Sequence, residues 1–203
     1  VTMGVPGFSA RLQDFDVLLA RHDVGIANVA TANYQAKLVI DELGIVIPRG
    51  YVAADATIRG RTYRVVTTHL EPFYDFLPPE MQIQIYQAQE LAATLQTTSL
   101  PVVLLGDFNM RATDEPAGIA LAYNVLADAG YADAWTHNVL PFNREGPTCC
   151  QRSDLMNPVS ELDRRFDQVW FKGTEKPGFE KGLGPVLAVV LGDEQRDRTP
   201  SGL

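Results

Sequence analysis

The 203-residue sequence has few cysteines, few histidines and no long apolar run. Its two cysteines, Cys149 and Cys150, are adjacent, and two thiols alone do not complete a tetrahedral zinc site. Neighbouring cysteines rarely bridge each other without strain, so we expect the pair to have a structural or incidental role. No stretch approaches the roughly 20 apolar residues of a membrane-spanning helix. A cysteine-based zinc domain and a transmembrane helix are therefore not predicted.

Positive charge is also scarce. The chain carries 17 lysines and arginines against 25 acidic residues, for a formal net charge of −8. Sequence-independent binding of nucleic acid needs a basic surface. The sequence offers only a small cluster around the predicted hairpin, formed by Arg49, Arg59, Arg61 and Arg64. This balance does not exclude an enzyme that acts on phosphates, because divalent cations can supply positive charge locally.

The chain shows no internal repeat, low-complexity tract or long linker, and 46% of its residues are hydrophobic. We therefore expect residues 1–203 to belong to one domain. Apolar runs and turn residues predict strands at 14–21, 51–58, 62–70, 101–105, 165–171 and 185–191. Helical spacing predicts helices at 79–97 and 116–129. This mixture predicts an α/β sandwich.

His69 ends one of these strands. On a pleated strand Val65, Thr67 and His69 share one face. A protonated histidine at a strand end could donate a hydrogen bond to a phosphate oxygen. The alternative is a histidine that only packs in the core or at its rim.

Asp107 and Asn109 follow the apolar strand 101–105 in the stretch Gly-Asp-Phe-Asn. Gly106 permits a sharp turn, Asp107 can bind a hard cation or orient a water, and Asn109 offers a donor and an acceptor without charge. The alternative is an ordinary turn in which both side chains bond their own backbone.

Asp167 lies between large apolar residues in Arg-Phe-Asp-Gln-Val, and a buried carboxylate there must be paired or hydrogen-bonded. One possibility is a salt bridge with Arg164 or Arg165. The other is a carboxylate that holds a catalytic histidine in the correct tautomer.

The ordered set is more specific than its parts. A strand ending in Thr-His-Leu, a helix, a strand ending in Gly-Asp-Phe-Asn and a later Arg-Phe-Asp follow one another along the chain. In this the sequence resembles the endonuclease/exonuclease/phosphatase superfamily, the deoxyribonuclease I-like metal-dependent phosphoesterases, from about residue 16 onward. The resemblance implies a four-layer α/β sandwich and hydrolysis of phosphoester bonds.

The resemblance also implies roles. His69 would contact the scissile phosphate, Asp107 would position the attacking water, and Asn109 would hold the phosphate or that water. Asp167 would orient a second histidine that acts as general acid–base. The expected metal is magnesium, or manganese or calcium, associated with Asp107 and Asn109. Asn33 and Tyr34 lie on a neighbouring segment but match no family motif.

Two parts of the family pattern are not found: the early asparagine and metal-binding glutamate, and the Ser-Asp-His stretch after the last strand. We therefore expect an incomplete copy of the fold that is inactive, or nearly so, by itself. We also expect an uncovered apolar sheet face that favours self-association. The substrate class stays open among nucleic acid, lipid and small phosphodiesters. The alternative function is a catalytically inactive fragment or binding module that keeps the fold.

Overall fold

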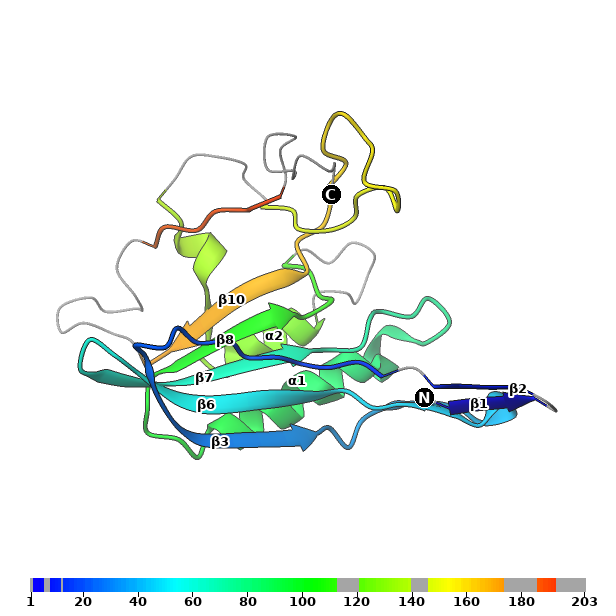
Figure 1. Ribbon diagram of the computed structural model, residues 1–203, viewed down its shortest axis with the longest axis horizontal. Helices are drawn as coiled ribbons and strands as arrows, with labels where there is room; N and C mark the ends of the chain where they lie inside the picture. Colours follow the sequence, from blue (N-terminus) through cyan, green and yellow to red (C-terminus); the bar gives the residue numbers. More distant parts are fainter. Residues whose placement is uncertain are drawn as a thin grey trace.

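A six-stranded sheet forms the centre of the molecule, with the strand order β3-β6-β7-β8-β10-β9 (Figure 1). This computed structural model describes residues 2–5, 8–11, 13–112, 121–139, 146–173 and 186–192. Strands β7 and β8 are parallel, and the other neighbours are antiparallel. The strands are β3 (Gly25–Asn33), β6 (Gly50–Ile58), β7 (Arg61–His69), β8 (Val102–Asp107), β9 (Ala132–Asp133) and β10 (Asp167–Lys172).

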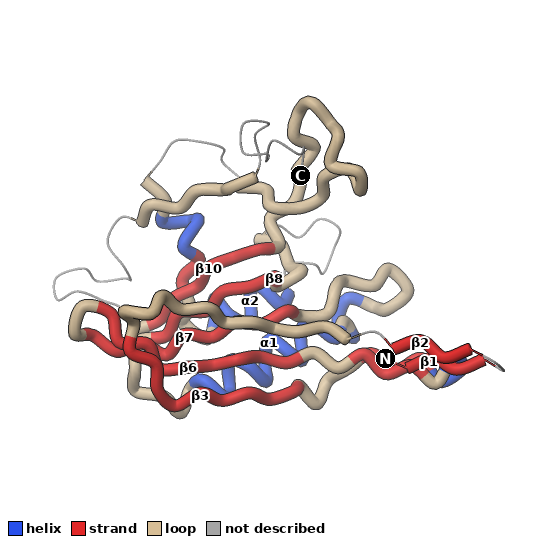
Figure 2. Tube along the Cα trace, viewed as in Figure 1, coloured by secondary structure: helices blue, strands red, loops and turns tan. Residues whose placement is uncertain are grey.

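Two helices and several small elements complete the described structure (Figure 2). The helices are α1 (Ile83–Leu95) and α2 (Leu121–Asp128). Two hairpins stand apart from the main sheet: β1 (Thr2–Val5) with β2 (Phe8–Arg11), and β4 (Leu38–Ile40) with β5 (Ile45–Ile47). Short 3-10 helices span Asp41–Leu43, Pro79–Met81 and Ala134–His137. No helix among these described segments is both long enough and apolar enough to cross a membrane.

The hydrophobic core lies between one face of the sheet and the two helices. Register places Ala53, Val66, Leu104 and Trp170 in one row across four strands, and each side chain is at most 3% exposed. Register partners point to the same side of a sheet, so this row forms one wall of the core. Helix residues that are buried against it include Ala88, Leu91, Leu95, Ala122 and Leu126.

The other face of the sheet is less covered. Val169 is 46% exposed there, and its register partner Leu105 is only half-buried. Residues 13–21 run in front of this face as an extended segment (Figure 1), and Phe15 remains 73% exposed. Strand 101–105 is therefore covered on its helix face and only partly on the other.

Most of the predicted elements are confirmed. The hairpin around Gly60 corresponds to β6 and β7, the strand at 101–105 to β8, and the strand at 165–171 to β10. The helix predicted at 79–97 begins with a 3-10 turn and is α-helical over Ile83–Leu95. The helix predicted at 116–129 is α-helical from Leu121 to Asp128, and its first residues lie outside the described part of the chain.

Two strand predictions are wrong. Residues 14–21 form a short apolar run but pair with no strand that the structure describes. Of the stretch predicted at 185–191, residue 185 lies outside the described part of the chain, and within 186–192 Val186 forms only an isolated bridge, with Asn138. The Asn138 side chain donates to the carbonyl of Ala188 at 2.7 Å and accepts from its N–H at 3.1 Å. A side-chain amide thus satisfies the backbone groups that a partner strand would otherwise have bonded.

Candidate active site

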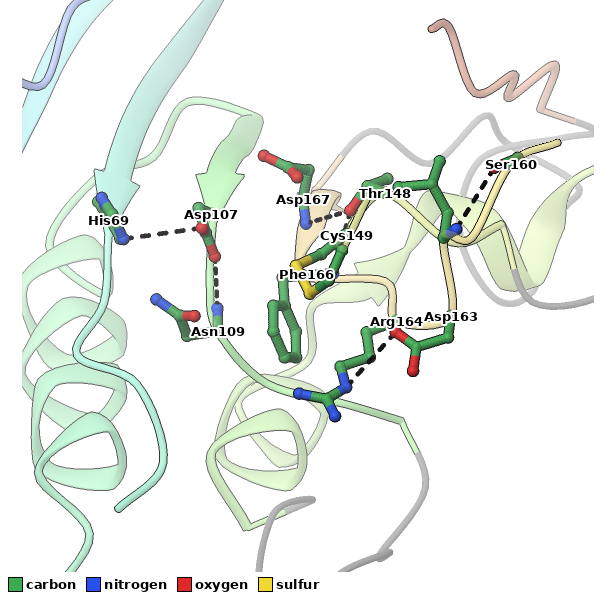
Figure 3. The surroundings of a disulfide bond; sticks show 12 residues. His69, Asp107, Asn109, Thr148, Cys149, Ser160, Asp163, Arg164, Phe166 and Asp167 are labelled. Carbon is green, nitrogen blue, oxygen red and sulfur yellow. Dashed lines mark hydrogen bonds and ion pairs between the residues drawn. A yellow bond between two sulfur atoms is a disulfide. The ribbon is translucent and has the colours of Figure 1, made fainter. Parts of the chain in front are cut away.

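Three of the predicted site residues lie side by side at the ends of adjacent strands. His69 is the last residue of β7 and Asp107 the last of β8, and they are register partners in the parallel pair. Asp167 is the first residue of antiparallel β10 and is the register partner of Asp107. Strand alternation places all three on the face opposite the buried row of Val66, Leu104 and Trp170. Figure 3 shows the three side chains at neighbouring strand ends. The structure therefore brings together residues that lie far apart in the sequence.

The turn after β8 depends on Gly106. Its φ is +142°, and a Cβ atom built there would lie 2.0 Å from the carbonyl oxygen of Thr68 on β7. Only glycine allows β7 and β8 to approach this closely in that conformation. Asp107 Oδ1 then accepts a hydrogen bond from the N–H of Asn109 at 2.8 Å. The Oδ1 atom of Asp107 thus bonds the local backbone, as in an ordinary turn. The Oδ2 atom does not, and lies 3.6 Å from Nε2 of His69.

Asn109 holds the turn against the loop that follows β7. Its Nδ2 donates to the carbonyl of Leu70 at 2.9 Å, and its φ of +50° is one that asparagine tolerates better than most residues. The buried side chain of Gln84, on α1, donates to the carbonyls of Asn109 and Glu71, both at 3.2 Å. Helix α1 thereby joins the two loops that carry the site.

Arg49 determines the tautomer of His69. Arg49 Nη1 lies 3.2 Å from Nδ1 of His69, and because a guanidinium can only donate, Nδ1 must accept. The remaining ring proton is then on Nε2, which faces Asp107 Oδ2 at 3.6 Å. That distance is too long for a direct hydrogen bond. The Nε2–H is therefore a donor next to the Asp107 carboxylate, with room for another oxygen to share it.

The position of Arg49 is itself determined by two carboxylates. Its Nε bonds Glu71 Oε2 at 3.2 Å, and its Nη1 bonds Asp14 Oδ2 at 3.1 Å. The Glu71 side chain is 1% exposed and also accepts from the hydroxyl of Tyr74 at 2.6 Å. Sequence reasoning did not assign Arg49, Glu71 or Asp14 to the site. The sequence feature that could have indicated this network is Glu71, which lies two residues after His69. A buried carboxylate requires a partner such as a cation.

Negative charge gathers around His69 and Arg49. Burial raises the pKa of Asp107 above its ordinary value of 3.8, and the nearby Asp167 carboxylate adds to this rise. The Asn109 N–H, His69 and Arg49 act in the opposite direction. Burial also raises the pKa of Asp16, whose carboxylate interacts electrostatically with His69. Carboxylates held in this way accept a proton more readily than exposed ones.

A cavity of about 370 Å³ opens beside this charged group. Its polar lining includes Asp14, Asp16 and Asn33. Tyr34, by contrast, is buried in the core, where its hydroxyl lies 2.8 Å from Oγ1 of Thr68. Asn33 therefore lines the cavity, whereas Tyr34 contacts β7 through Thr68.

Asp167 differs from the sequence expectation in its surroundings. Its side chain is exposed, so no buried partner is required. The salt bridges of the neighbouring arginines go to other carboxylates: Arg164 binds Asp163, and Arg165 binds Asp133. The backbone N–H of Asp167 donates to Oγ1 of Thr148 at 3.0 Å.

The two cysteines also differ from expectation, because Cys149 and Cys150 form a disulfide with each other. Figure 3 shows this disulfide near Thr148 and Asp167. The general rarity of bridges between neighbouring cysteines did not predict this pair, which lies next to a predicted site residue.

Few of the described side chains are placed so that they could coordinate a metal ion together. Across residues 13–112, 121–139, 146–173 and 186–192, no three side chains of His, Cys, Asp or Glu are grouped so as to hold an ion. Asp107 and Asp167 are opposite one another and supply carboxylate oxygens. Mg²⁺ is commonly bound by one or two carboxylates and completes its shell with water and substrate phosphate, so these donors fit such an ion.

Solved structures with the same fold are known, although no protein-family model and no curated protein matches the sequence. A mannosyl-6-phosphatase from Bacteroides thetaiotaomicron matches 76% of this chain and 55% of its own, with a TM-score of 0.54 and 14% identity. A truncated TDP2 from Caenorhabditis elegans matches 89% and 61%, with a TM-score of 0.52 and 17% identity. An endonuclease/exonuclease/phosphatase family protein from Bacteroides thetaiotaomicron matches 74% and 52%, with a TM-score of 0.51 and 14% identity.

The chain therefore has the α/β fold of the endonuclease/exonuclease/phosphatase structures, as the ordered motifs predicted. It spans between half and about three fifths of the length of these structures. The described residues supply a six-stranded sheet with helices packed on one of its faces, and two small two-stranded sheets.

Proposed function

We propose that this chain carries the phosphate-binding part of a phosphoester hydrolase of the endonuclease/exonuclease/phosphatase type. The observation that carries the proposal is the row formed by His69, Asp107 and Asp167 across three neighbouring strands. The shared fold supports it, because structures of that fold include a mannosyl-6-phosphatase. In the reaction a water oxygen would attack phosphorus, and the phosphorus–oxygen bond to the leaving group would break.

The residues suit separate parts of that reaction. His69, with its proton on Nε2, and Arg49 can donate to phosphate oxygens and stabilise the charge that develops on them. Asp107 would orient the attacking water and accept its proton, which its raised pKa favours. Asn109 would hold the turn and bind the phosphate or the water. Asp167 would keep the role expected from the family, that of orienting a general acid–base.

A divalent cation, magnesium or else manganese or calcium, is part of the proposal. Asp107 and Asn109 would hold it, with Asp167 as a further carboxylate opposite Asp107. When bound, the ion would polarise phosphate oxygens. A nearby cation would also offset the burial and the like charge that oppose ionisation of Asp107.

The substrate class is a phosphate ester, and the loop after His69 would contact its organic part. Tyr74 and Phe76 lie with ring centroids 5.0 Å apart, and Phe76 is 70% exposed. Such a pair can stack on a base or enter a lipid interface. The net charge of −8 favours a lipid or a small phosphodiester over non-specific nucleic acid binding.

The test compares the full-length protein with its His69→Ala and Asp107→Ala variants. Turnover of a chromogenic phosphodiester, a phosphomonoester, sphingomyelin vesicles and single-stranded DNA is measured with and without Mg²⁺. We expect each substitution to lower kcat/KM by at least about 100-fold for the accepted substrate. His22→Ala is the matched control, because His22 is exposed and lies in the turn before β3, beyond the opposite end of the sheet from His69. Turnover that survives both site substitutions would disprove the site assignment.

A second candidate is a binding module without turnover, which the limited set of metal ligands in the described segments favours. Inorganic phosphate distinguishes the two. Binding that shifts the NMR signals of His69 and Asn109, without hydrolysis of any substrate in the panel, would support the binding module. Neither binding nor hydrolysis would disprove both candidates.

A further inference from the structure

The Cys149–Cys150 disulfide lies on a segment that is bonded directly to the start of β10 (Figure 3). The N–H groups of Thr148 and Cys149 both donate to the carbonyl of Arg164, at 2.7 and 2.8 Å. In return, the N–H groups of Asp163 and Arg164 donate to the carbonyl of Cys149, at 2.8 and 3.0 Å. The backbone of a disulfide cysteine is thus part of the support on which the β10 entry rests.

Thr148 extends this support to the candidate site. Its Oγ1 accepts from the N–H of Asp167 at 3.0 Å and from the N–H of Phe166 at 3.2 Å. From the other side, Phe108 donates its N–H to the carbonyl of Phe166 at 2.9 Å. The entry to β10, Phe166 and Asp167, is therefore held between the turn that follows Asp107 and the segment that carries the disulfide.

The position of Asp167 relative to Asp107 depends on this clamp. Asp167 has an exposed side chain, so no surrounding side chains fix its place by packing. Its backbone hydrogen bonds and its register opposite Asp107 define where the carboxylate lies. A change in the backbone at Thr148 and Cys149 would move those bonds first.

We propose that the Cys149–Cys150 disulfide is a redox-sensitive device that positions Asp167 through Thr148. The link between neighbouring residues restricts their backbone torsions, and its loss frees them. A small dithiol would reduce it: one thiolate attacks a cysteine sulfur, the S–S bond breaks, and a mixed disulfide forms. The second thiol of the reductant then displaces the remaining cysteine thiolate, which takes up a proton, and the reductant leaves as its own disulfide.

The geometry permits this exchange, because Cys150 is exposed and Cys149 is only half-buried. The expected effect of reduction on turnover rests on the proposed function, since it requires Asp167 to act in the site. The expected effect on the backbone at Phe166 and Asp167 does not rest on the proposed function.

The test is amide hydrogen exchange, followed by NMR on the whole 203-residue chain before and after treatment with dithiothreitol. We expect exchange at Phe166 and Asp167 to become at least about tenfold faster on reduction, because the acceptor at Thr148 is no longer held. The amide of Leu104, in the buried part of β8, serves as the internal control and should not change. Unchanged protection at Phe166 and Asp167, with both thiols shown to be free, would overturn the proposal.

Two sets of variants separate positioning from general stability. Cys149→Ser/Cys150→Ser should show the fast exchange of the reduced protein under both conditions. Thr148→Val keeps the disulfide but removes the hydroxyl acceptor, so both amides should exchange fast even when oxidised. Thr148→Ser restores the acceptor and should restore protection. Slow exchange in Thr148→Val would show that the hydroxyl does not hold β10.

A turnover measurement on the full-length protein then distinguishes this proposal from the proposed function. If a phosphoester is hydrolysed, reduction should lower kcat with little change in KM, and Thr148→Ser should stay sensitive to the reductant. If nothing is hydrolysed but amide exchange responds to reduction as described, the hydrolase proposal is disproved and the disulfide proposal is supported. If a substrate is hydrolysed but amide exchange does not respond to reduction, the disulfide proposal is disproved and the hydrolase proposal is supported.

Discussion

Replacing Gly106 with alanine tests how tightly the site depends on the contact between β7 and β8. The added Cβ would lie 2.0 Å from the carbonyl oxygen of Thr68 and 3.1 Å from its backbone nitrogen and carbonyl carbon. These neighbours are backbone atoms, so no side-chain rotation can relieve the clash. One of the two strands must move, and that movement separates His69 from Asp107.

The cost can be worked from two contributions. A φ of +142° belongs to a region that non-glycine residues rarely occupy, which costs about 1–3 kcal/mol. Forcing well-packed groups apart costs about 1–3 kcal/mol more. The expected loss is therefore roughly 2–6 kcal/mol, a large share of the roughly 5–15 kcal/mol that stabilises a typical domain.

Urea unfolding followed by tryptophan fluorescence measures this loss, since Trp170 is 1% exposed in the folded state. The matched control is Gly60→Ala in the turn between β6 and β7. Gly60 also has a positive φ, of +78°, but a Cβ there would meet nothing within 4 Å. That variant should lose only about 1–2 kcal/mol, the cost of the backbone conformation. Equal unfolding midpoints for the two variants would refute the argument that the Thr68 contact sets the strand spacing.

Three further predictions concern charge and packing. Arg165→Ala should destabilise the fold by about 3–5 kcal/mol, because it leaves the Asp133 carboxylate, 1% exposed, without its cation. Arg21→Ala, which breaks an exposed ion pair, should cost less than about 1 kcal/mol, and similar urea midpoints for the two would contradict this. Asp107→Asn should raise the melting temperature relative to wild type at pH 7 but not at pH 3. The raised pKa of Asp107 means that folded protein binds a proton more tightly than unfolded protein, so wild-type stability falls as pH rises above 3.8 towards the folded pKa. A melting-temperature difference that did not depend on pH would disprove the burial argument. Leu104→Ala should cost about 2–5 kcal/mol in urea unfolding, since Leu104 is fully buried between sheet and helices, and a loss below about 1 kcal/mol would mean that this core is loosely packed.

Local sequence was sufficient for the elements that carry the motifs. The hairpin signal around Gly60 and the apolar run before Gly106 predicted β7 and β8, and helical spacing predicted α1. It was not sufficient at residues 14–21, where a short apolar run predicted a strand. A strand requires a partner with free backbone groups, and among the described strands none is paired with this segment.

The sequence by itself determined which side chains end the strands: His69, Asp107 and Asp167, each placed by a turn or an alternation that is readable locally. Only the tertiary structure decided what surrounds them. Arg49 reaches Glu71 across 22 residues and Asp14 across 35, and Thr148 reaches Asp167 across 19. These contacts depend on strand register and on how loops return to the sheet, which are set by the packing of the whole core and not by any local pattern.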